Sequence, residues 1–316
     1  MRRTSPTAVV IVASWLLLAG PCQRGTAETP LFPDQLVDFG PASRDPLFVG
    51  GGPQAWDRDI RERGWIMRES GRWHLWYTGS NMDRSPLRRL GYASSPDGLN
   101  WVRGNGNPLV QDAWVEDVCI VRRGGCLVMF AEGEQDIAHW LTSTDRLHWR
   151  GHGPVDIRLV DGSPIPDGPR GTPTVWCERG TWYLFYERRD AGVWLATSRD
   201  LRRFTNVSDS PVLSCGPDPY DRHLIAMNQV VRHAGRYYAY YHASGRPQGG
   251  EWSTCIATSD DLEHWVKYAG NPVLPVDRDH PTRSSATLVH DGTRYRLYTT
   301  HPDVRVRFSV VPAGQP

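Results

Sequence analysis

The sequence predicts an all-β fold, a single five-bladed β-propeller, from an internal repeat and from the strand pattern within each repeat. A unit that ends in Ser-x-Asp-x-x-x-Trp or Phe occurs four times along the chain. Upstream of each copy lies a hairpin whose second strand is rich in aromatic or apolar residues, and a fifth such hairpin follows the last copy. Repeats of about 45–60 residues with several strands each are typical of propeller blades. The four copies begin at Ser95, Ser143, Ser198 and Ser259.

The Ser-x-Asp element is interpreted as a tight turn between the outer strands of a blade. Side chains of Ser and Asp hydrogen-bond the backbone of such turns, and the aromatic residue packs back onto the sheet. A tail such as Asn107-Pro108-Leu109-Val110 follows three of the copies and is interpreted as the link to the next blade. These motifs therefore receive a structural role and no chemistry.

The repeat divides the chain into five blades that follow an export signal. We predict a signal peptide over residues 1–27, because Arg2 and Arg3 precede an apolar run that is too short to span a bilayer. The propeller is expected over residues 28–316, in a secreted or periplasmic protein. The fifth blade lacks an outer strand, and whether the segment from Leu36 to Val49 supplies it stays open. The blades are expected at about residues 52–111, 112–160, 168–214, 220–275 and 279–312.

Composition limits the classes of partner. The chain has 36 Lys and Arg against 35 Asp and Glu, so its net charge gives no reason to expect nucleic acid or an anionic membrane surface. The 14 Trp and 12 Tyr suit half-buried sheets and also stack on sugar rings. We expect a carbohydrate partner, with no nucleic acid and no integral membrane association. No metal ligands and no cofactor are predicted, although a structural cation in the axial channel stays open.

The cysteines show no metal-ligand spacing. Cys119 and Cys126 flank one hairpin turn, so a cross-strand disulfide and two free thiols are alternatives that the sequence does not separate.

The blade signature resembles a known group of enzymes. Tyr-x-x-Tyr, then Ser-x-Asp-Leu-x-x-Trp, then Asn-Pro-Val-Leu is similar to the five-bladed glycoside hydrolases, namely family 43 with its arabinanases and xylosidases, the invertase-like family 32, and families 117 and 130. The resemblance covers roughly residues 45–312. It implies that a sugar binds at the centre of one propeller face. It also implies that acidic residues at the start of the innermost strands and in adjoining loops carry the chemistry.

Alignment of the hairpins on their aromatic strands predicts which residues begin each innermost strand. Only blade two has acids in this row, Glu116 and Asp117, which resemble the acids at the same place in the family. In blade one, Asp57 and Asp59 precede the strand, and we choose Asp57 as the candidate general base.

Blade three departs from the arabinanase pattern, because the stretch 169–174 lacks the expected general acid. The second strand of a hairpin returns to the same face, and its end is Glu187 in blade three. Glu132, His242 and His301 hold the matching place in other blades. Glu187 is therefore the candidate acid, with His242 and His301 as alternatives, since family 117 is understood to use a His. The predicted catalytic residues are Asp57, Asp117 and Glu187.

Further residues are expected to bind the substrate. Glycoside hydrolysis needs a proton donor and a carboxylate, and acids clustered in one cup raise one another's pKa values. Arginine and asparagine would hold hydroxyls or lower a neighbouring pKa, and tryptophan would stack on sugar. The candidate substrate-binding residues are Trp56, Arg63, Trp114, Glu116, Arg170, Asn228, His242 and His301.

These expectations lead to a secreted glycoside hydrolase that cleaves a poly- or oligosaccharide. Two alternatives stay open. One is an enzyme similar to mannoside phosphorylases, whose phosphate subsite would use Arg63, Arg170, Arg222 and His223. The other is a sugar-binding propeller without catalytic activity, which the missing acid of blade three keeps in consideration.

Overall fold

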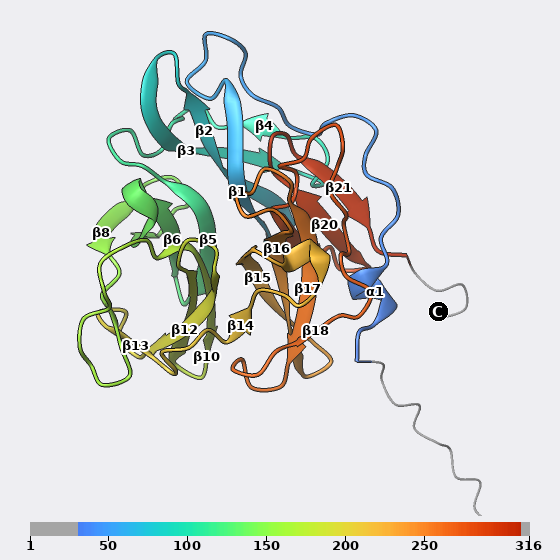
Figure 1. Ribbon diagram of the computed structural model, residues 1–316. Helices are drawn as coiled ribbons and strands as arrows, with labels where there is room; N and C mark the ends of the chain where they lie inside the picture. Colours follow the sequence, from blue (N-terminus) through green and yellow to red (C-terminus); the bar gives the residue numbers. More distant parts are fainter. Residues whose placement is uncertain (1–30, 311–316) are drawn as a thin grey trace, which may run out of the picture. The chain divides into compact units, whose positions relative to one another are not determined.

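Residues 31–310 are described by a computed structural model of the chain, and the predicted signal peptide lies outside this range. The described chain folds into five mainly antiparallel sheets arranged in a ring, which confirms the all-β, five-bladed propeller (Figure 1). The innermost strands contact one another in the order β1, β5, β10, β15 and β19, and β19 contacts β1 again. The ring therefore closes between the first and the fifth blade.

The strands of each blade follow one another in sequence from the axis outward. Blade one holds β1 (Asp59–Glu69), β2 (Arg72–Asn81), β3 (Ser85–Ser95) and β4 (Val102–Arg103). Blade two holds β5 (Glu116–Arg123), β6 (Cys126–Gly133), β7 (Ile137–Ser143) and β8 (Arg150–Pro154), with the short helix η1 (Glu134–Asp136) between β6 and β7. Blade three holds β10 (Gly171–Glu178), β11 (Thr181–Glu187), β12 (Gly192–Ser198) and β13 (Phe204–Asn206), joined by β9 (Ile157–Arg158) and β14 (Leu213–Ser214).

The last two blades follow the same plan. Blade four holds β15 (Leu224–His233), β16 (Arg236–Ser244), β17 (Ser253–Ser259) and β18 (Val266–Lys267), preceded by the short helix η2 (Pro219–Asp221). Blade five holds β19 (Ala286–His290), β20 (Tyr295–Thr299) and β21 (Arg305–Phe308). One short helix, α1 (Asp34–Val37), precedes the first blade.

The N-terminal segment completes the fifth blade. Phe39 pairs with Ser309 and Phe48 with Val304 in antiparallel bridges, and the N–H groups of Gly40 and Leu47 donate to carbonyls in the same stretch. This segment runs beside β21 in Figure 1. It supplies the outer edge that blade five lacks, so the segment that the sequence left open does close the ring.

The Ser-x-Asp turns make the predicted hydrogen bonds. In the first copy, Oγ of Ser95 accepts from the N–H of Gly98, and Oδ1 of Asp97 accepts from the N–H of Leu99 and of Asn100. The copies that begin at Ser143, Ser198 and Ser259 repeat this pattern. Each turn lies between the third and fourth strands of its blade, far from the axis, which fits a structural role.

The aromatic second strands fill the space between blades. Trp76, Phe130, Phe185, Tyr240 and Tyr298 are almost completely buried, and each lies on the second strand of a different blade. Large aromatic side chains bury more apolar surface than any others, so this row supplies much of the packing between adjacent sheets.

The cysteines of the described chain are free thiols. Gly124 and Gly125 form a two-residue turn that pairs Arg123 with Cys126, so Cys119 faces Phe130 and not Cys126. The cross-strand disulfide is therefore not formed, because the two cysteines do not share a register position.

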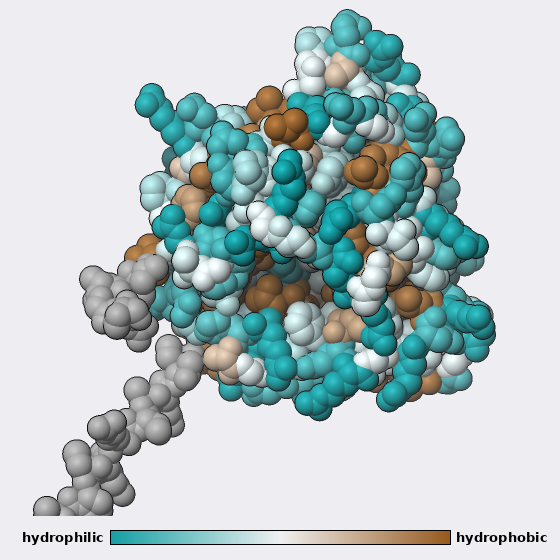
Figure 2. Space-filling model, turned by 180° about the vertical axis from the view of Figure 1, so that it is seen from behind, coloured by the Kyte–Doolittle hydropathy of each residue, from teal (hydrophilic) through white to brown (hydrophobic). Residues whose placement is uncertain are grey.

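No helix in the part of the chain that the structure describes is long and apolar enough to cross a bilayer. Figure 2 shows the molecule from behind, where hydrophilic residues dominate and apolar residues appear as small separate patches, some of them within a hollow.

Candidate active site

A β-bulge begins the innermost strand of blades one, two and three. The pairing register of the strand shifts at this place, and one residue in each bulge has a left-handed backbone: Glu62 (φ 48°), Asp117 (φ 47°) and Thr172 (φ 42°). Bulges re-aim side chains and occur often beside functional sites. All three residues line one cavity. The repeated bulge therefore directs one side chain from each of three blades into the same space.

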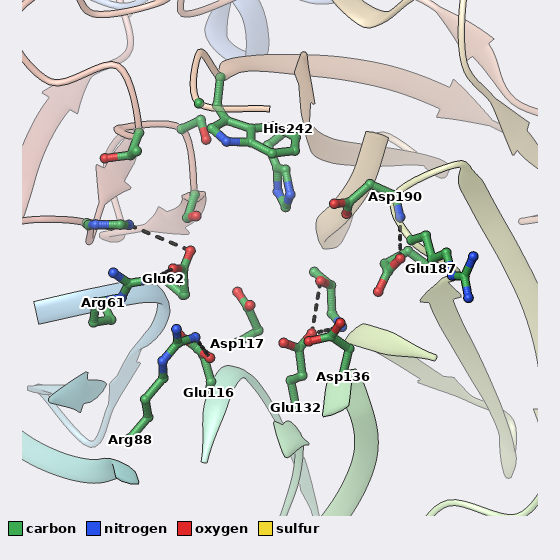
Figure 3. Close-up of a pocket in the computed structure, with 18 residues that line it drawn as sticks. Arg61, Glu62, Arg88, Glu116, Asp117, Glu132, Asp136, Glu187, Asp190 and His242 are labelled. Atoms are coloured by element: carbon green, nitrogen blue, oxygen red, sulfur yellow. Dashed lines mark hydrogen bonds and ion pairs between the residues drawn. The ribbon is translucent and has the colours of Figure 1, made fainter. Parts of the chain in front are cut away.

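This cavity, the central pocket, has a volume of about 620 Å³ and receives residues from all five blades. A volume of this size is typical of small-molecule sites. Its carboxyl groups are arranged around the pocket, with Glu62 on one side, Glu187 on the opposite side and Asp117 between them (Figure 3). The carboxyl residues are Glu62, Glu116, Asp117, Glu132, Asp136, Glu187 and Asp190. The basic and other named members include Arg61, Arg88, Arg189, His242, Trp252 and His301.

Several residues selected from the sequence lie in this pocket. Glu116 and Asp117 line it from β5, and Glu187 lines it from the end of β11. His242 lines it from β16, and His301 lines it from the loop after β20. The residues at or just after the ends of the second strands in blades two to five thus line one cavity. They are Glu132, Glu187, His242 and His301.

Asp57 lies outside the central pocket, which corrects its expected position. Its side chain is only 2% exposed. The Tyr77 hydroxyl donates to Oδ2 of Asp57 over 2.8 Å, and Nε of Arg103 donates to the same oxygen over 2.8 Å. The carboxylate is thus held by two side chains of blade one, and its geometry fits a structural ion pair. Trp56, its neighbour, stacks against Tyr77 in the same apolar cluster and also lies outside the pocket.

Arg63 is fully buried and does not line the central pocket. Its guanidinium donates to the backbone carbonyls of Pro173, Met227 and Asn228 over 2.7–3.0 Å, and also to that of Asp117. Arg63 therefore joins the inner strands of four blades at the axis. Its positive charge lies at the propeller axis, the place where a structural cation was considered in the sequence analysis.

Three other candidates also lie outside the lining of the pocket. Asn228 is fully buried behind His242, and Trp114 lines a neighbouring groove while its Nε1 donates to Glu116. Arg170 pairs through its backbone with the Asp136–Ala138 segment and is absent from the residues that line the pocket. Asn228 and Trp114 thus support lining residues and do not face the cavity themselves.

Glu62, like Asp136 and Asp190, is a pocket acid that the sequence alignment missed. The bulge separates Glu62 from the paired residue Trp65 by three positions, whereas Asp117 and Cys119 in blade two are separated by two. Counting back equally from the aromatic strands therefore selects Arg63 in place of Glu62. In the sequence, Glu62 directly precedes Arg63, the position that the alignment selects. The length of the bulge shows that Glu62, and not Arg63, corresponds to Asp117.

The surroundings of Glu62 keep its carboxylate ionised. Burial raises the pKa of Glu62, but His301, Arg61 and Arg88 together outweigh burial and lower it to about 2. Nη2 of Arg61 lies 2.7 Å from Oε1, and Nδ1 of His301 lies 3.7 Å from Oε2. Glu62 is therefore negatively charged throughout the neutral range.

On the opposite side, Glu187 and Glu132 flank the backbone of blade three. The N–H of Gly171 donates to Oε1 of Glu187 over 3.1 Å, and the N–H of Thr172 donates to Oε2 of Glu132 over 2.7 Å. A Cβ atom at Gly171 would lie 2.6 Å and 2.3 Å from these oxygens, so only glycine fits between the two carboxyl groups. Blade three therefore provides peptide donors where the family pattern places an acid.

Burial and mutual repulsion favour the protonated form of several pocket acids. Burial raises the pKa of Glu187 to about 7, with Asp136 and Asp117 adding to the rise and backbone donors opposing it. Burial likewise raises the pKa of Glu132 well above its ordinary value, that of Asp117 to about 6 and that of Glu116 to about 8. The pocket thus combines an ionised Glu62 with carboxyl groups whose raised pKa values make a proton donor available near neutral pH.

His242 presents a neutral imidazole to the pocket. Burial, with a smaller contribution from Arg63, lowers its pKa to about 4. Nδ1 of His242 lies 2.7 Å from Oδ1 of Asn228, whose amide nitrogen donates to the carbonyl of Ser284. Since this oxygen accepts, Nδ1 carries the proton and Nε2 is an acceptor. At neutral pH His242 therefore suits a sugar hydroxyl as partner and not the role of proton donor.

Solved structures resemble this chain in fold. A candidate glycosidase from Bacteroides thetaiotaomicron has a TM-score of 0.72 at 18% identity, over 88% of this chain and 98% of that chain. A glycosyl hydrolase from Bacteroides ovatus has a TM-score of 0.64 at 18% identity, over 83% and 86%. A β-1,2-mannobiose phosphorylase from Listeria innocua has a TM-score of 0.61 at 14% identity, over 79% and 89%.

Neither a protein-family model nor a curated protein matches the sequence. At identities below one fifth, the solved structures show the five-bladed propeller fold that this chain shares with them.

Proposed function

We propose that this protein is an exported glycoside hydrolase, which cleaves a poly- or oligosaccharide in the central pocket. One observation carries the proposal: Glu62 is held ionised on one side of the pocket, while the pKa of Glu187 on the other side is raised to about 7. Glycosidases need such a pair of carboxyl groups on the two sides of the scissile bond. The neighbours that are glycosidases and mannoside phosphorylases support a carbohydrate substrate.

The two acids have distinct roles in this proposal. Glu187 gives its proton to the glycosidic oxygen as the bond from that oxygen to the anomeric carbon breaks. Glu62 either takes a proton from the attacking water or attacks the anomeric carbon itself, and water then completes hydrolysis. Asp117 lies between them, and the neutral His242 accepts a sugar hydroxyl.

The charge of the pocket favours water over phosphate as the attacking group. Two of its three arginines, Arg61 and Arg88, form ion pairs with Glu62 and Glu116. The basic residues considered for a phosphate subsite do not line the pocket, and Arg63 among them is used by backbone carbonyls. A phosphate dianion would enter a space rich in carboxyl groups, which costs electrostatic free energy.

Export remains part of the proposal. It rests on the arginines and the apolar run within residues 1–27, which are typical of a signal peptide. An exported enzyme meets polysaccharides outside the cytoplasm, where hydrolysis needs no supply of phosphate. Localisation of the full-length chain in a bacterial host, with a variant that lacks residues 1–27 as control, tests this part.

The proposed activity is tested with aryl glycosides and with arabinan, xylan and mannan oligosaccharides in phosphate-free buffer. The wild type is expected to release sugar, and Glu62→Gln is expected to lower kcat by about 10²–10⁴-fold. The variant should stay folded, because the amide fits the same space, although its thermal transition should fall somewhat with the loss of the Arg61 ion pair. Full activity in Glu62→Gln would exclude this residue as the base. Sugar binding without any release by the wild type would favour the non-catalytic propeller.

A further inference from the structure

A second cavity, the blade-two groove, lies beside the outer strands of blade two and has a volume of about 520 Å³. Two tryptophans line it, Trp114 from the link between blades one and two, and Trp149 from the turn before β8. Both are partly exposed. Trp114 is one of the residues predicted to stack on sugar, and it lies outside the central pocket, in the wall of this groove.

The groove and the central pocket share a wall. Trp114 lines the groove, and its Nε1 donates over 3.0 Å to Oε2 of Glu116, which lines the pocket. The turn after β6 alternates in the same way, since Glu132 and Asp136 line the pocket whereas Gly133, Glu134 and Ile137 line the groove. The two cavities are therefore neighbours on the same face of blade two, separated by these two segments.

The lining of the groove fits an uncharged sugar. Tryptophan faces and exposed polar groups in one concave surface are typical of carbohydrate sites, because sugars have apolar faces and hydroxyl edges. Nε2 of His139 is buried beside the groove and has no hydrogen-bond partner within the described chain. Asp112 and Glu134 add carboxylates, and no Arg or Lys of residues 31–310 lines the groove, which disfavours an anionic sugar.

We propose that the blade-two groove binds further sugar units of the saccharide whose scissile bond lies in the central pocket. This inference rests on the proposed function, and it adds a preference for long, uncharged substrates. Binding energy from such a remote subsite is expected to raise kcat/KM for long chains and to leave cleavage of a single-sugar glycoside unchanged.

Gly151 offers a way to fill the groove without disturbing its wall. It lines the groove, its backbone is not left-handed, and a Cβ atom there would have no neighbour within 4 Å. Gly125 provides the matched control, because a Cβ atom there is equally free and the residue lies in the β5–β6 turn, outside both cavities. The test therefore compares Gly151→Phe with Gly125→Phe. Glu134→Ala, at an exposed position in the groove, serves as a milder second variant.

The experiment measures kcat/KM and, in the Glu62→Gln background whose cleavage is expected to be slow, the Kd for mannan, arabinan and xylan oligosaccharides of two to six units. Gly151→Phe is expected to weaken binding of the longest bound oligosaccharide by at least about tenfold, and Glu134→Ala by about twofold to fivefold. Gly125→Phe should match the unmodified protein. Cleavage of an aryl monosaccharide glycoside should change less than about twofold in all three variants.

Unchanged oligosaccharide binding in Gly151→Phe, with a normal thermal transition, would overturn the subsite while leaving the hydrolase proposal intact. A protein that binds long chains no more tightly than a single sugar would overturn it as well. If the wild type cleaves nothing but Gly151→Phe still weakens binding, the hydrolase proposal fails and the groove remains a sugar site.

Discussion

The carboxyl groups of Glu62 and Glu187 lie in environments that move their pKa values in opposite directions. His301 and two arginines hold the pKa of Glu62 at about 2 against burial, whereas burial and neighbouring acids raise that of Glu187 to about 7. Two carboxyl groups whose pKa values differ in this way can act as base and acid at the same pH. Asp57 differs from both, because Tyr77 and Arg103 hold it outside the pocket.

The role of Glu187 is tested by the leaving group of the substrate. A poor leaving group needs a proton from the enzyme, whereas 2,4-dinitrophenolate leaves without one. Glu187→Gln is therefore expected to lose about 10²–10⁴-fold in kcat on an alkyl or sugar leaving group, but less than about tenfold on a dinitrophenyl glycoside. Equal losses on both substrates in steady-state assays would show that Glu187 is not the proton donor.

The same residue predicts the pH dependence of cleavage. Since the donor must be protonated, kcat/KM for a poor leaving group should fall as pH rises above about 7, where Glu187 ionises. The dinitrophenyl substrate should not show this decrease. A profile that rises between pH 6.5 and 8.5 with the poor leaving group would contradict the assignment.

Asp57 should prove structural. Asp57→Ala removes the partner of the Tyr77 hydroxyl and of the half-exposed Arg103, and it is expected to lower the free energy of unfolding by about 1–3 kcal/mol. The activity of the folded variant should stay within about threefold of the wild type. Urea denaturation and kinetics on the same preparation check both points, and a large loss of kcat in the folded variant would return Asp57 to the catalytic residues.

At the scale of elements, ring closure depends on the segment from residue 39 to residue 48. Phe48 pairs with Val304, its ring lies 4.9 Å from that of Tyr77, and Arg103 stacks over it at 4.3 Å. Phe48→Ala is expected to lower the free energy of unfolding by about 3 kcal/mol, because it leaves a cavity where blades one and five meet.

Val49→Ala is the control for this prediction. Val49 is 49% exposed, and its truncation should change stability by less than about 0.5 kcal/mol. Equal effects of the two variants in urea denaturation would mean that the N-terminal segment does not hold the ring closed.

At the scale of the whole molecule, the carboxyl groups buried in the central pocket lower the free energy of unfolding when they are ionised. The pKa values of Glu116, Glu132, Glu187 and Asp190 are raised in the folded state by burial first, and the neighbouring carboxyl group of Asp117 adds to the rise in all four. Between pH 6.5 and 8.5 the folded protein therefore binds more protons than the unfolded chain, whose carboxyl groups are ionised. Stability must fall as pH rises through this window.

This sign gives a measurable prediction. Buried histidines with lowered pKa values oppose the trend only below about pH 6.5, so the melting temperature should fall from pH 6.5 to pH 8.5. Asp190→Asn should raise the melting temperature at pH 8.5 and reduce the slope, because the amide mimics the protonated acid. A melting temperature that rises with pH across this window would contradict the assignment of protonated acids.

The repeat predicts the propeller because each blade repeats the same local chemistry. The Ser-x-Asp turns and the aromatic second strands depend on residues that are close in sequence, so both can be recognised before the fold is known. The ends of the second strands could be aligned for the same reason, and Glu187 and His242 do lie in the pocket. The bulge that re-aims Glu62 depends on contacts between blades, so its length could not be predicted from the sequence, although an acid stood one residue before the selected position.

Contacts with residues far away in the sequence explain why Arg63 and Asp57 do not lie where the sequence predicted. Arg63 resembles a substrate-binding arginine in the sequence, but carbonyl groups from other blades surround it at the axis. Asp57 resembles a loop acid until Tyr77 and Arg103 are placed beside it. Burial of a charged residue depends on residues far away in the chain, and local pattern cannot supply that information.

The most direct test of the central claim is cleavage in ¹⁸O-labelled water with wild type and Glu62→Gln, followed at once by mass spectrometry of the released sugar. The account predicts one ¹⁸O atom in the newly formed reducing sugar, the same product with and without phosphate, and a nearly complete loss of product in the variant. Free sugar incubated in the same water corrects for spontaneous exchange. Formation of a sugar phosphate that depends on added phosphate, with no labelled sugar, would contradict the account.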